Sequence, residues 1–330
     1  MKRRNLLIAS GALLAAPFAG LAQQSGKVWR IGFLVPSMPE LNPGDPDPYS
    51  EAFTRQMKAA GHRMFADYVI TIRSAVGEYE RLPALARELL QLKADILVPV
   101  SPVAISAAYQ ASKTVPIVCI GAHDPVGMGL AASLARPGGN LTGLATFYAE
   151  IIPKHLELLK SIVPGASRVA GLAIAATLLD PGALQKVRDA ALKLGMRLQL
   201  VPVDSTEQLP RAFADMTRER ADAFITVADP AFVRDRRQLA ELALKHRLPS
   251  FFPTRENVAA GGLLSYGEDF VDLFAQAAKY VSKIMGGVKP GDLPIEQPKK
   301  FQLAINVRTA RALKLNIPQE LLLRADEVIE

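Results

Sequence analysis

Residues 94–120 read ADILVPVSPVAISAAYQASKTVPIVCI, and they contain one complete strand–helix–strand pattern. Two apolar runs, Asp95–Val100 and Val115–Ile120, flank a segment of helical pattern at Val103–Ser112. Both runs are continuous in their hydrophobicity, as expected for parallel strands whose two faces are covered by helices. The stretch therefore predicts a unit whose right-handed crossover belongs to a doubly wound α/β layer.

The same alternation continues toward the N-terminus of this unit. Strands are expected at Trp29–Val35 and Tyr68–Ile72, and helices at Tyr49–Ala60 and Glu78–Leu92. Short β-branched runs thus alternate with longer helical stretches through the first half of the chain. This half is predicted to form one α/β lobe.

A second series of the same kind begins after Thr146. Its strands are expected at Arg168–Ala175, Arg197–Val203, Ala223–Ala228, Pro249–Phe252 and Gly262–Tyr266, and its helices at Lys154–Ile162, Leu179–Leu194, Thr206–Glu219 and Ala231–His246. Two such lobes in tandem predict a cleft between them, and ligands of parallel sheets lie outside the carboxyl ends of the strands. No low-complexity linker separates the halves, so we expect hinged lobes.

The first 22 residues have the pattern of a secretory signal peptide. Lys2, Arg3 and Arg4 precede an apolar run at Leu6–Phe18, and the small residues Gly20 and Ala22 follow at the positions that a signal peptidase requires to be small. The run is shorter than the ~20 residues that span a bilayer, which favours a cleaved signal over a membrane anchor. We expect cleavage after Ala22, and the paired arginines permit either general secretion or twin-arginine export.

Charge and cysteine content narrow the possible partners. Removal of the three basic residues of the signal lowers the formal charge from +7 to +4, and no dense basic block interleaved with aromatic residues exists. Nucleic-acid binding is therefore not expected. Cys119 is the only cysteine, so an intrachain disulfide is impossible. Its apolar surroundings predict a buried structural thiol.

Polar residues after the predicted first-lobe strands form one half of a candidate ligand site. Ser37 follows the first strand, and Ser101 precedes Pro102 at a helix N-terminus that could receive a carboxylate. Asp124 could pair with a ligand ammonium, because a buried charge requires a partner. Ser101 and Asp124 could equally serve as caps of the helices that follow them.

The second half of the candidate site comes from the hinge region and the second lobe. Its members stand at strand ends or beside the predicted cleft, and they are Thr146, Thr177, Asp229, Glu256 and Tyr266. Asp229 precedes Pro230 and is open to the same two interpretations as Asp124, ligand contact or helix capping. Either Glu256 or Arg255 could face the cleft, with a solvated surface pair as the alternative.

Catalytic and cofactor-binding patterns are not found. The four histidines are scattered without the spacing of metal ligands. Residues 127–132 fit G-x-G-x-x-A, but they are not in the first strand–helix turn, where the dinucleotide fingerprint belongs. A phosphate-binding G-x-x-x-x-G-K-[ST] loop is also missing. We therefore expect no enzyme activity and no cofactor, and energy for any transport would come from a separate ATPase.

Several short motifs occur in an order typical of one protein family. They are Ile31–Leu34, Glu78–Ala86, Asp124–Gly127, Arg136–Gly143, Ala228–Pro230, Ala259–Leu263, Ser265–Gly267 and Leu322–Glu330. By these motifs the chain resembles, from end to end, bacterial ABC-transporter substrate-binding proteins of the branch related to tryptophan- and tyrosine-binding proteins. One difference is the segment 176–182, where many relatives have a loop rich in Asn and Pro. If that loop helps to set ligand preference, the ligand of this chain cannot be taken over from a better-known relative.

The resemblance implies a type I periplasmic-binding-protein fold with three passages of the chain between the lobes. Lobe 1 would comprise 27–145 with 267–290, and lobe 2 would comprise 146–266 with 291–330. The hinge crossings would then lie near Thr146, Gly267 and Gly291. On this template Val271–Met285 returns as a helix to the first lobe.

The resemblance also implies a function without catalysis. It implies a monomeric periplasmic receptor that closes on a small polar molecule, such as an amino acid or a related carboxylate, and delivers it to a membrane permease. A ligand-sensing subunit of a signalling system would use the same cleft and is the main alternative. An exported α/β enzyme is a third and less favoured interpretation.

Overall fold

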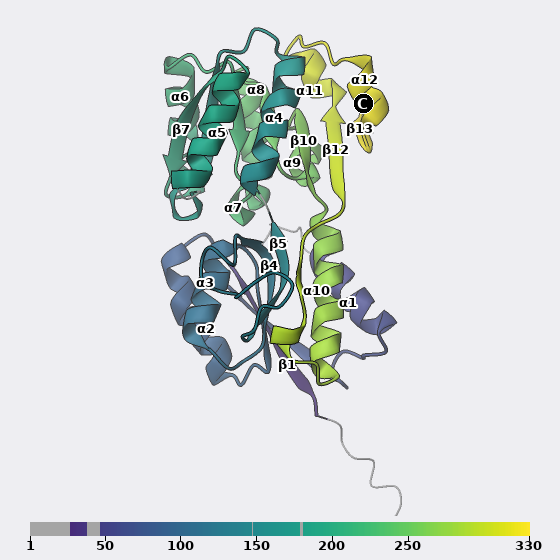
Figure 1. Ribbon diagram of the computed structural model, residues 1–330. Coiled ribbons are helices and arrows are strands. Elements are labelled where there is room, and N and C mark those ends of the chain that lie inside the picture. Colours follow the sequence, from purple (N-terminus) through teal and green to yellow (C-terminus); the bar gives the residue numbers. More distant parts are fainter. Residues whose placement is uncertain (1–26, 38–46, 147, 179–180) are drawn as a thin grey trace, which may run out of the picture.

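The computed structural model describes residues 27–37, 47–146, 148–178 and 181–330. Within these ranges the chain forms two α/β lobes, one above the other (Figure 1). The predicted signal peptide at 1–22 lies outside the described residues. Each helix in the described part is too short or too polar to cross a membrane.

The first lobe contains a six-stranded parallel sheet with the order β11-β5-β4-β3-β1-β2. Its strands are β1 (Trp29–Val35), β2 (Tyr68–Ser74), β3 (Ile96–Pro99), β4 (Ile117–His123), β5 (Leu141–Thr146) and β11 (Ile295–Glu296). The strand–helix–strand stretch at residues 94–120 contains β3 and the start of β4, which lie at the centre of this sheet. The predicted parallel sheet is therefore confirmed for this lobe.

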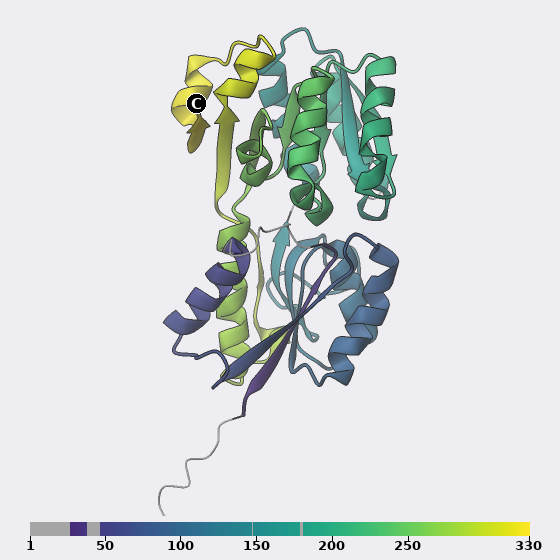
Figure 2. The ribbon, with the colours of Figure 1, turned by 180° about the vertical axis from the view of Figure 1, so that it is seen from behind.

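Helices cover both faces of the first sheet. They are α1 (Pro48–Ala59), α2 (Leu82–Gln91), α3 (Pro102–Ala111) and α10 (Phe270–Met285). Helices α1 and α10 pack together on one face, and α2 and α3 on the other, with the sheet between them (Figure 2). Cys119 on β4 is fully buried in this core, and burial raises the pKa of its thiol to about 12.

The second lobe contains a seven-stranded sheet with the order β13-β12-β10-β9-β8-β6-β7. Its strands are β6 (Arg168–Ile174), β7 (Arg197–Val203), β8 (Ala223–Thr226), β9 (Ser250–Phe252), β10 (Leu264–Glu268), β12 (Phe301–Asn306) and β13 (Glu327–Ile329). All pairs are parallel except β10 with β12. These two run in opposite directions because β10 leads the chain into the first lobe and β12 brings it back.

The helices of the second lobe largely follow the predicted segments. They are α4 (Tyr148–Ile162), α5 (Pro181–Lys193), α6 (Leu209–Arg218), α7 (Pro230–Arg234), α8 (Arg236–Lys245), α9 (Arg255–Ala259), α11 (Val307–Ala312) and α12 (Gln319–Arg324). The single helix expected over Ala231–His246 is divided into α7 and α8 at Asp235, whose backbone leaves the helical region at φ −95° and ψ 26°.

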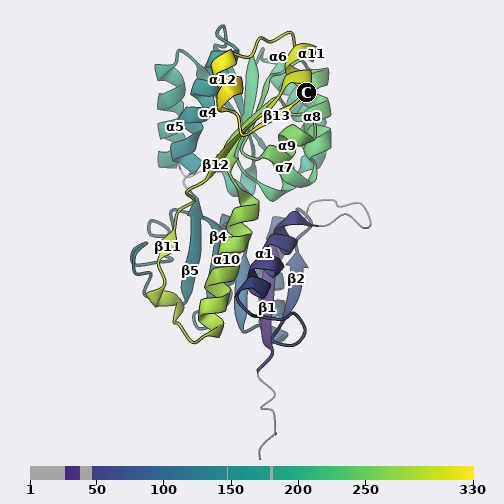
Figure 3. The same cartoon turned by 90° about the vertical axis from the view of Figure 1, so that its right-hand side faces the viewer.

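Three passages connect the lobes, as the resemblance implies. The first follows β5, the second joins β10 to α10, and the third runs from β11 to β12 (Figure 3). The third passage lies later than the predicted crossing near Gly291. Ile295 and Glu296 pair with Gly143 and Leu144 of β5, so this segment is part of the first sheet.

Strand β5 was not predicted, because a glycine interrupts its apolar pattern. Gly143 has φ +127°, and a Cβ atom there would lie 2.3 Å from the Cys119 carbonyl oxygen. The close approach of β5 to β4 therefore requires glycine at this position. A residue that weakens the strand pattern in the sequence thus allows the strand to form.

Candidate ligand-binding site

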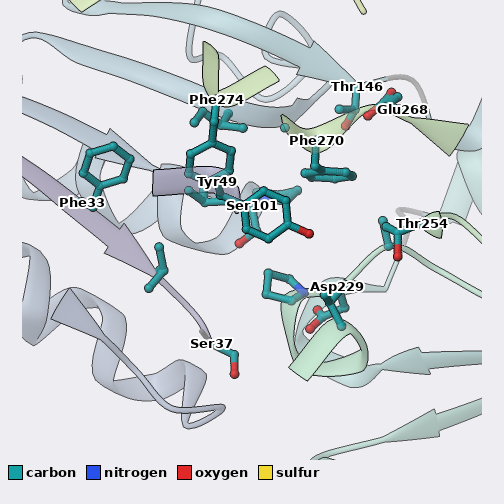
Figure 4. A pocket seen from close by; sticks show the side chains of 18 of the residues that line it. Phe33, Ser37, Tyr49, Ser101, Thr146, Asp229, Thr254, Glu268, Phe270 and Phe274 are labelled. Carbon is teal, nitrogen blue, oxygen red and sulfur yellow. The ribbon is translucent and has the colours of Figure 1, made fainter. Parts of the chain in front are cut away.

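A pocket of about 110 Å³ lies between the two lobes, where the carboxyl ends of both sheets meet. First-lobe residues at or just after the ends of β1, β3, β4 and β5 line one side, and second-lobe residues at or just after the ends of β8, β9 and β10 line the other. Figure 4 shows the side chains that converge on it. This is the place that the strand-end rule for parallel sheets predicts.

Aromatic rings form the apolar wall of the pocket. Phe33 comes from β1, Tyr49 from α1, and Phe270 and Phe274 from α10 (Figure 4). The rings of Phe33 and Phe274 stack with centroids 6.2 Å apart, and Tyr49 lies 5.2 Å from Phe274. These separations are typical of attractive aromatic pairs, so the wall is preformed.

Four predicted site residues line this pocket: Ser37, Ser101, Thr146 and Asp229. Ser101 is only 8% exposed, and its hydroxyl oxygen is buried without a hydrogen-bond partner. It begins α3 at φ +85° and does not cap the helix with its side chain. The capping interpretation of Ser101 is therefore wrong, while its contact with a ligand remains a prediction.

The other predicted residues do not line the pocket. Asp124 is exposed, and its carboxylate accepts a hydrogen bond from the Gly127 N–H at 2.9 Å, which is local capping of a turn. Tyr266 instead stacks on Phe301 with ring centroids 5.8 Å apart. Glu256 lies beside the Tyr49 hydroxyl, and this negative charge adds to burial in raising the pKa of Tyr49. Glu256 therefore contacts Tyr49 of the aromatic wall and does not itself line the pocket.

Asp229 is a buried carboxyl whose partners all belong to the protein. It accepts hydrogen bonds from the Tyr79 hydroxyl, from Thr177 at 3.0 Å and from the Ala231 N–H at 2.8 Å. Burial raises its pKa above the usual range, while these donors oppose that shift. Tyr79 belongs to the first lobe, so Asp229 bonds across the cleft and also caps α7.

A second bond across the cleft comes from Arg234 at the end of α7. Its guanidinium donates to the Val76 carbonyl at 3.0 Å and to the Ser37 hydroxyl at 3.3 Å, both in the first lobe. On its own lobe it pairs with Asp235 at 2.6 Å. The described conformation therefore has the lobes in direct polar contact beside the pocket.

Glu268 is the pocket residue that sequence reasoning missed most clearly. It is the last residue of β10, only 7% exposed, and its Oε1 atom is buried without a hydrogen-bond partner. Burial raises the pKa of its carboxyl to about 8. Just before it, Gly267 allows β10 to approach Pro253, whose carbonyl oxygen would lie 1.8 Å from any Cβ atom at 267.

The other missed residues differ in the signal that the sequence offered for them. Phe270 and Phe274 reach the pocket from α10, and the sequence predicted a helix at Val271–Met285 returning to the first lobe without assigning any of its residues to the site. Thr254 lines the pocket directly after β9, so the strand-end rule could have found it. His123 also lines it at the end of β4, and burial lowers the pKa of its imidazole to about 4.

Comparison with known proteins assigns a family to this architecture. The family model described as ABC transporter substrate binding protein matches residues 49–329. A tyrosine-binding protein from Clostridioides difficile (strain R20291) is 23% identical over 269 residues, which cover 82% of this chain and 77% of that protein. These matches confirm the resemblance inferred from the sequence motifs.

Solved structures show the same fold. A conserved domain protein from Vibrio cholerae O1 biovar El Tor superposes with a TM-score of 0.82 and 25% identity, covering 92% of this chain and 100% of that one. An ABC domain in complex with L-Trp from Streptococcus pneumonia superposes with a TM-score of 0.81 and 22% identity over the same shares. The family model matches most of the length of this chain, and the chain therefore belongs to the ABC transporter substrate binding protein family.

Proposed function

We propose that this chain is the extracytoplasmic receptor of an ABC transporter, which encloses an aromatic amino acid between its lobes. It then delivers the ligand to a membrane permease driven by a separate ATPase. The observation that carries this proposal is the pocket between the lobes, with aromatic rings on one side and buried polar groups from both lobes. Binding between hinged lobes couples capture to a closed form that a permease can recognise.

The chemistry of the pocket supports an aromatic amino acid. The rings of Phe33, Tyr49, Phe270 and Phe274 provide a wall on which a ligand ring could stack. The N-terminus of α3 suits a carboxylate, because its first N–H groups are not capped by a side chain and the buried Ser101 hydroxyl points to the same pocket. The names of two similar proteins, a tyrosine-binding protein and an L-Trp complex, indicate the same ligand class.

A thermal-shift screen of residues 23–330 tests capture. The panel contains L-tryptophan, L-tyrosine and L-phenylalanine, together with aliphatic amino acids, acidic amino acids and sugars. A ligand at ~100 times its Kd stabilises the folded state by about 2.7 kcal/mol, so an aromatic amino acid should raise the melting temperature. A shift with sugars alone would reject the aromatic ligand, and no shift with any compound would contradict small-molecule capture.

Two variants make the screen specific to the pocket. Phe270→Ala removes a ring from the wall and should abolish most of the shift. Phe65→Ala removes a ring that is 78% exposed and outside the pocket lining, so it should leave the shift unchanged. An equal loss in both variants would mean that the shift does not report on the pocket.

Export has its own test. The signal peptide predicts that the protein recovered from an osmotic-shock fraction begins at Gln23. N-terminal sequencing of that fraction checks this, and a protein that keeps Met1 would contradict export with cleavage. Size-exclusion chromatography of the same material should give the mass of a monomer.

A further inference from the structure

We infer that Glu268 is the ligand-binding carboxylate of this pocket and pairs with a protonated amine on the ligand. This inference rests on the proposed function and assigns the part of the ligand that binds at the end of β10. Three observations support it. The Oε1 atom of Glu268 has no hydrogen-bond partner, the pocket is lined by acids and by no lysine or arginine among the described residues, and the carboxyl of Asp229 is hydrogen-bonded within the protein.

The position of Glu268 leaves one oxygen for a ligand. Its side chain lines the pocket, and Oε1 is buried without a partner in the described structure. A buried acceptor without a hydrogen bond destabilises the folded state, and more so if it is charged. A ligand that donates to Oε1 removes this cost, so the geometry favours a donor at this end of the pocket.

The charges around the pocket make that donor a cation. No lysine or arginine occurs among the described residues that line it, whereas three acids do: Asp47, Asp229 and Glu268. Asp47 caps α1 through the Tyr49 and Ser50 N–H groups, and Asp229 is fully hydrogen-bonded within the protein. Glu268 is therefore the lining acid whose Oε1 atom has no partner among the described residues.

The titratable groups on neighbouring elements do not supply a counterion. On α10, Asp269 follows Glu268 and caps the helix through the Asp272 N–H. On β12, Phe301 lies opposite Glu268, and the preceding Lys300 points to Asp272 with an Nζ–Oδ1 distance of 3.8 Å. Across the pocket lie the Tyr49 hydroxyl and His123, and the low pKa of that imidazole makes it neutral near pH 7.

Binding of an ammonium group should release a proton. Without ligand, burial keeps the Glu268 carboxyl largely protonated at pH 7, since its pKa is about 8. An adjacent cation favours the ionised form, so the carboxyl proton passes to solvent as the amine binds. Affinity for an amine should therefore rise about tenfold per pH unit below pH 8 and level off above it.

Isothermal titration of residues 23–330 with three compounds tests the inference. L-Tryptophan has both charged groups, tryptamine lacks the carboxylate, and indole-3-propionate lacks the amine. Glu268→Gln should weaken both amine-bearing compounds by about 10- to 100-fold and leave indole-3-propionate unaffected. Titration at pH 7 in two buffers of different ionisation enthalpy should show release of close to one proton with the wild type and none with Glu268→Gln.

A matched control and the possible outcomes complete the experiment. Glu157→Gln changes an exposed glutamate that pairs with Lys154 on its own helix, so it should bind all three compounds like the wild type. Equal affinity of Glu268→Gln for the amines, or binding of indole-3-propionate alone, would overturn the role of Glu268 and leave the receptor function intact. Failure of the wild type to bind any of the three compounds would overturn both proposals.

Discussion

The ends of strands β8 and β10 each place a buried carboxyl in the cleft, and the two carboxyls are in opposite situations. Asp229, after β8, is 3% exposed and accepts three hydrogen bonds from the protein, one of them across the cleft. Glu268, at the end of β10, is 7% exposed and has one oxygen without a partner. The comparison separates a carboxyl that joins the lobes from one that remains available to a ligand.

The largest expected effect concerns the pH dependence of stability. The folded pKa of Glu268 is about 8, and the unfolded value is about 4.3. Because the folded pKa is raised, the contribution of Glu268 to stability is complete below pH ~4.3. It is lost as the pH rises to ~8, at about 1.4 kcal/mol per pH unit. The side chain of Glu268→Gln does not titrate. The unfolding free energy of the variant relative to that of the wild type should therefore increase by up to about 4 kcal/mol as the pH rises from 5 to 8.

Urea unfolding of both proteins without ligand at pH 5, 6, 7 and 8 measures this difference. Because all other groups are shared, their titration cancels when the two curves are subtracted. Parallel pH profiles would mean that Glu268 has a partner in solution, and the contrast with Asp229 would disappear.

A smaller effect is expected when the partnered carboxyl is removed. Asp229→Ala leaves the Tyr79 hydroxyl and the Ala231 N–H without their acceptor, whereas the Thr177 hydroxyl keeps the Ile174 carbonyl, and the unfolding free energy should fall by about 2–3 kcal/mol. Asp124→Ala is the matched control, because it removes an exposed Asp-Pro carboxylate with a single turn contact and should cost under about 1 kcal/mol. Denaturant midpoints compare the two, and equal losses would contradict the assignment of Asp229.

The smallest effect on stability is expected at one of the polar contacts across the cleft, the hydrogen bond from Tyr79 to Asp229. Tyr79→Phe keeps the ring and removes the hydroxyl that donates to Asp229, at a cost of about 0.5–1.5 kcal/mol. Because this bond joins the lobes, the unliganded protein should open, and small-angle scattering should give a larger radius of gyration. Tyr109→Phe, a first-lobe tyrosine that stacks under Lys113, should leave the radius unchanged. An unchanged radius in both variants would show that the bond does not hold the lobes together.

The architecture was predictable because the strands of both sheets are continuous apolar runs with clear breaks. Strand β1 at Trp29–Val35 and strand β7 at Arg197–Val203 have the predicted bounds. The short strands β11 and β13 were not found, since two or three residues carry no periodicity. Their positions depend on pairing with β5 and β12, and this pairing is set by the tertiary structure and not by the local sequence.

The site was predictable in position and less so in the role of each residue. Asp124-Pro125 and Asp229-Pro230 are the same dipeptide after a strand, yet Asp124 is exposed and caps a turn while Asp229 is buried and bridges the lobes. The partner that distinguishes them, Tyr79, lies 150 positions away in the chain. Glu268 was overlooked because its environment depends on how closely Gly267 packs against Pro253.

The location of Thr146 and Glu268 has a consequence for kinetics. Each is the last residue of a strand, β5 and β10, immediately before the chain passes to the other lobe. Residues at a pivot move least when two bodies rotate about it, so their contacts can form while the lobes are still apart. Contacts farther from the pivot form only on closure. Substitutions at Thr146 and Glu268 should therefore act on the association rate, and those at Ser37 should act mainly on the dissociation rate.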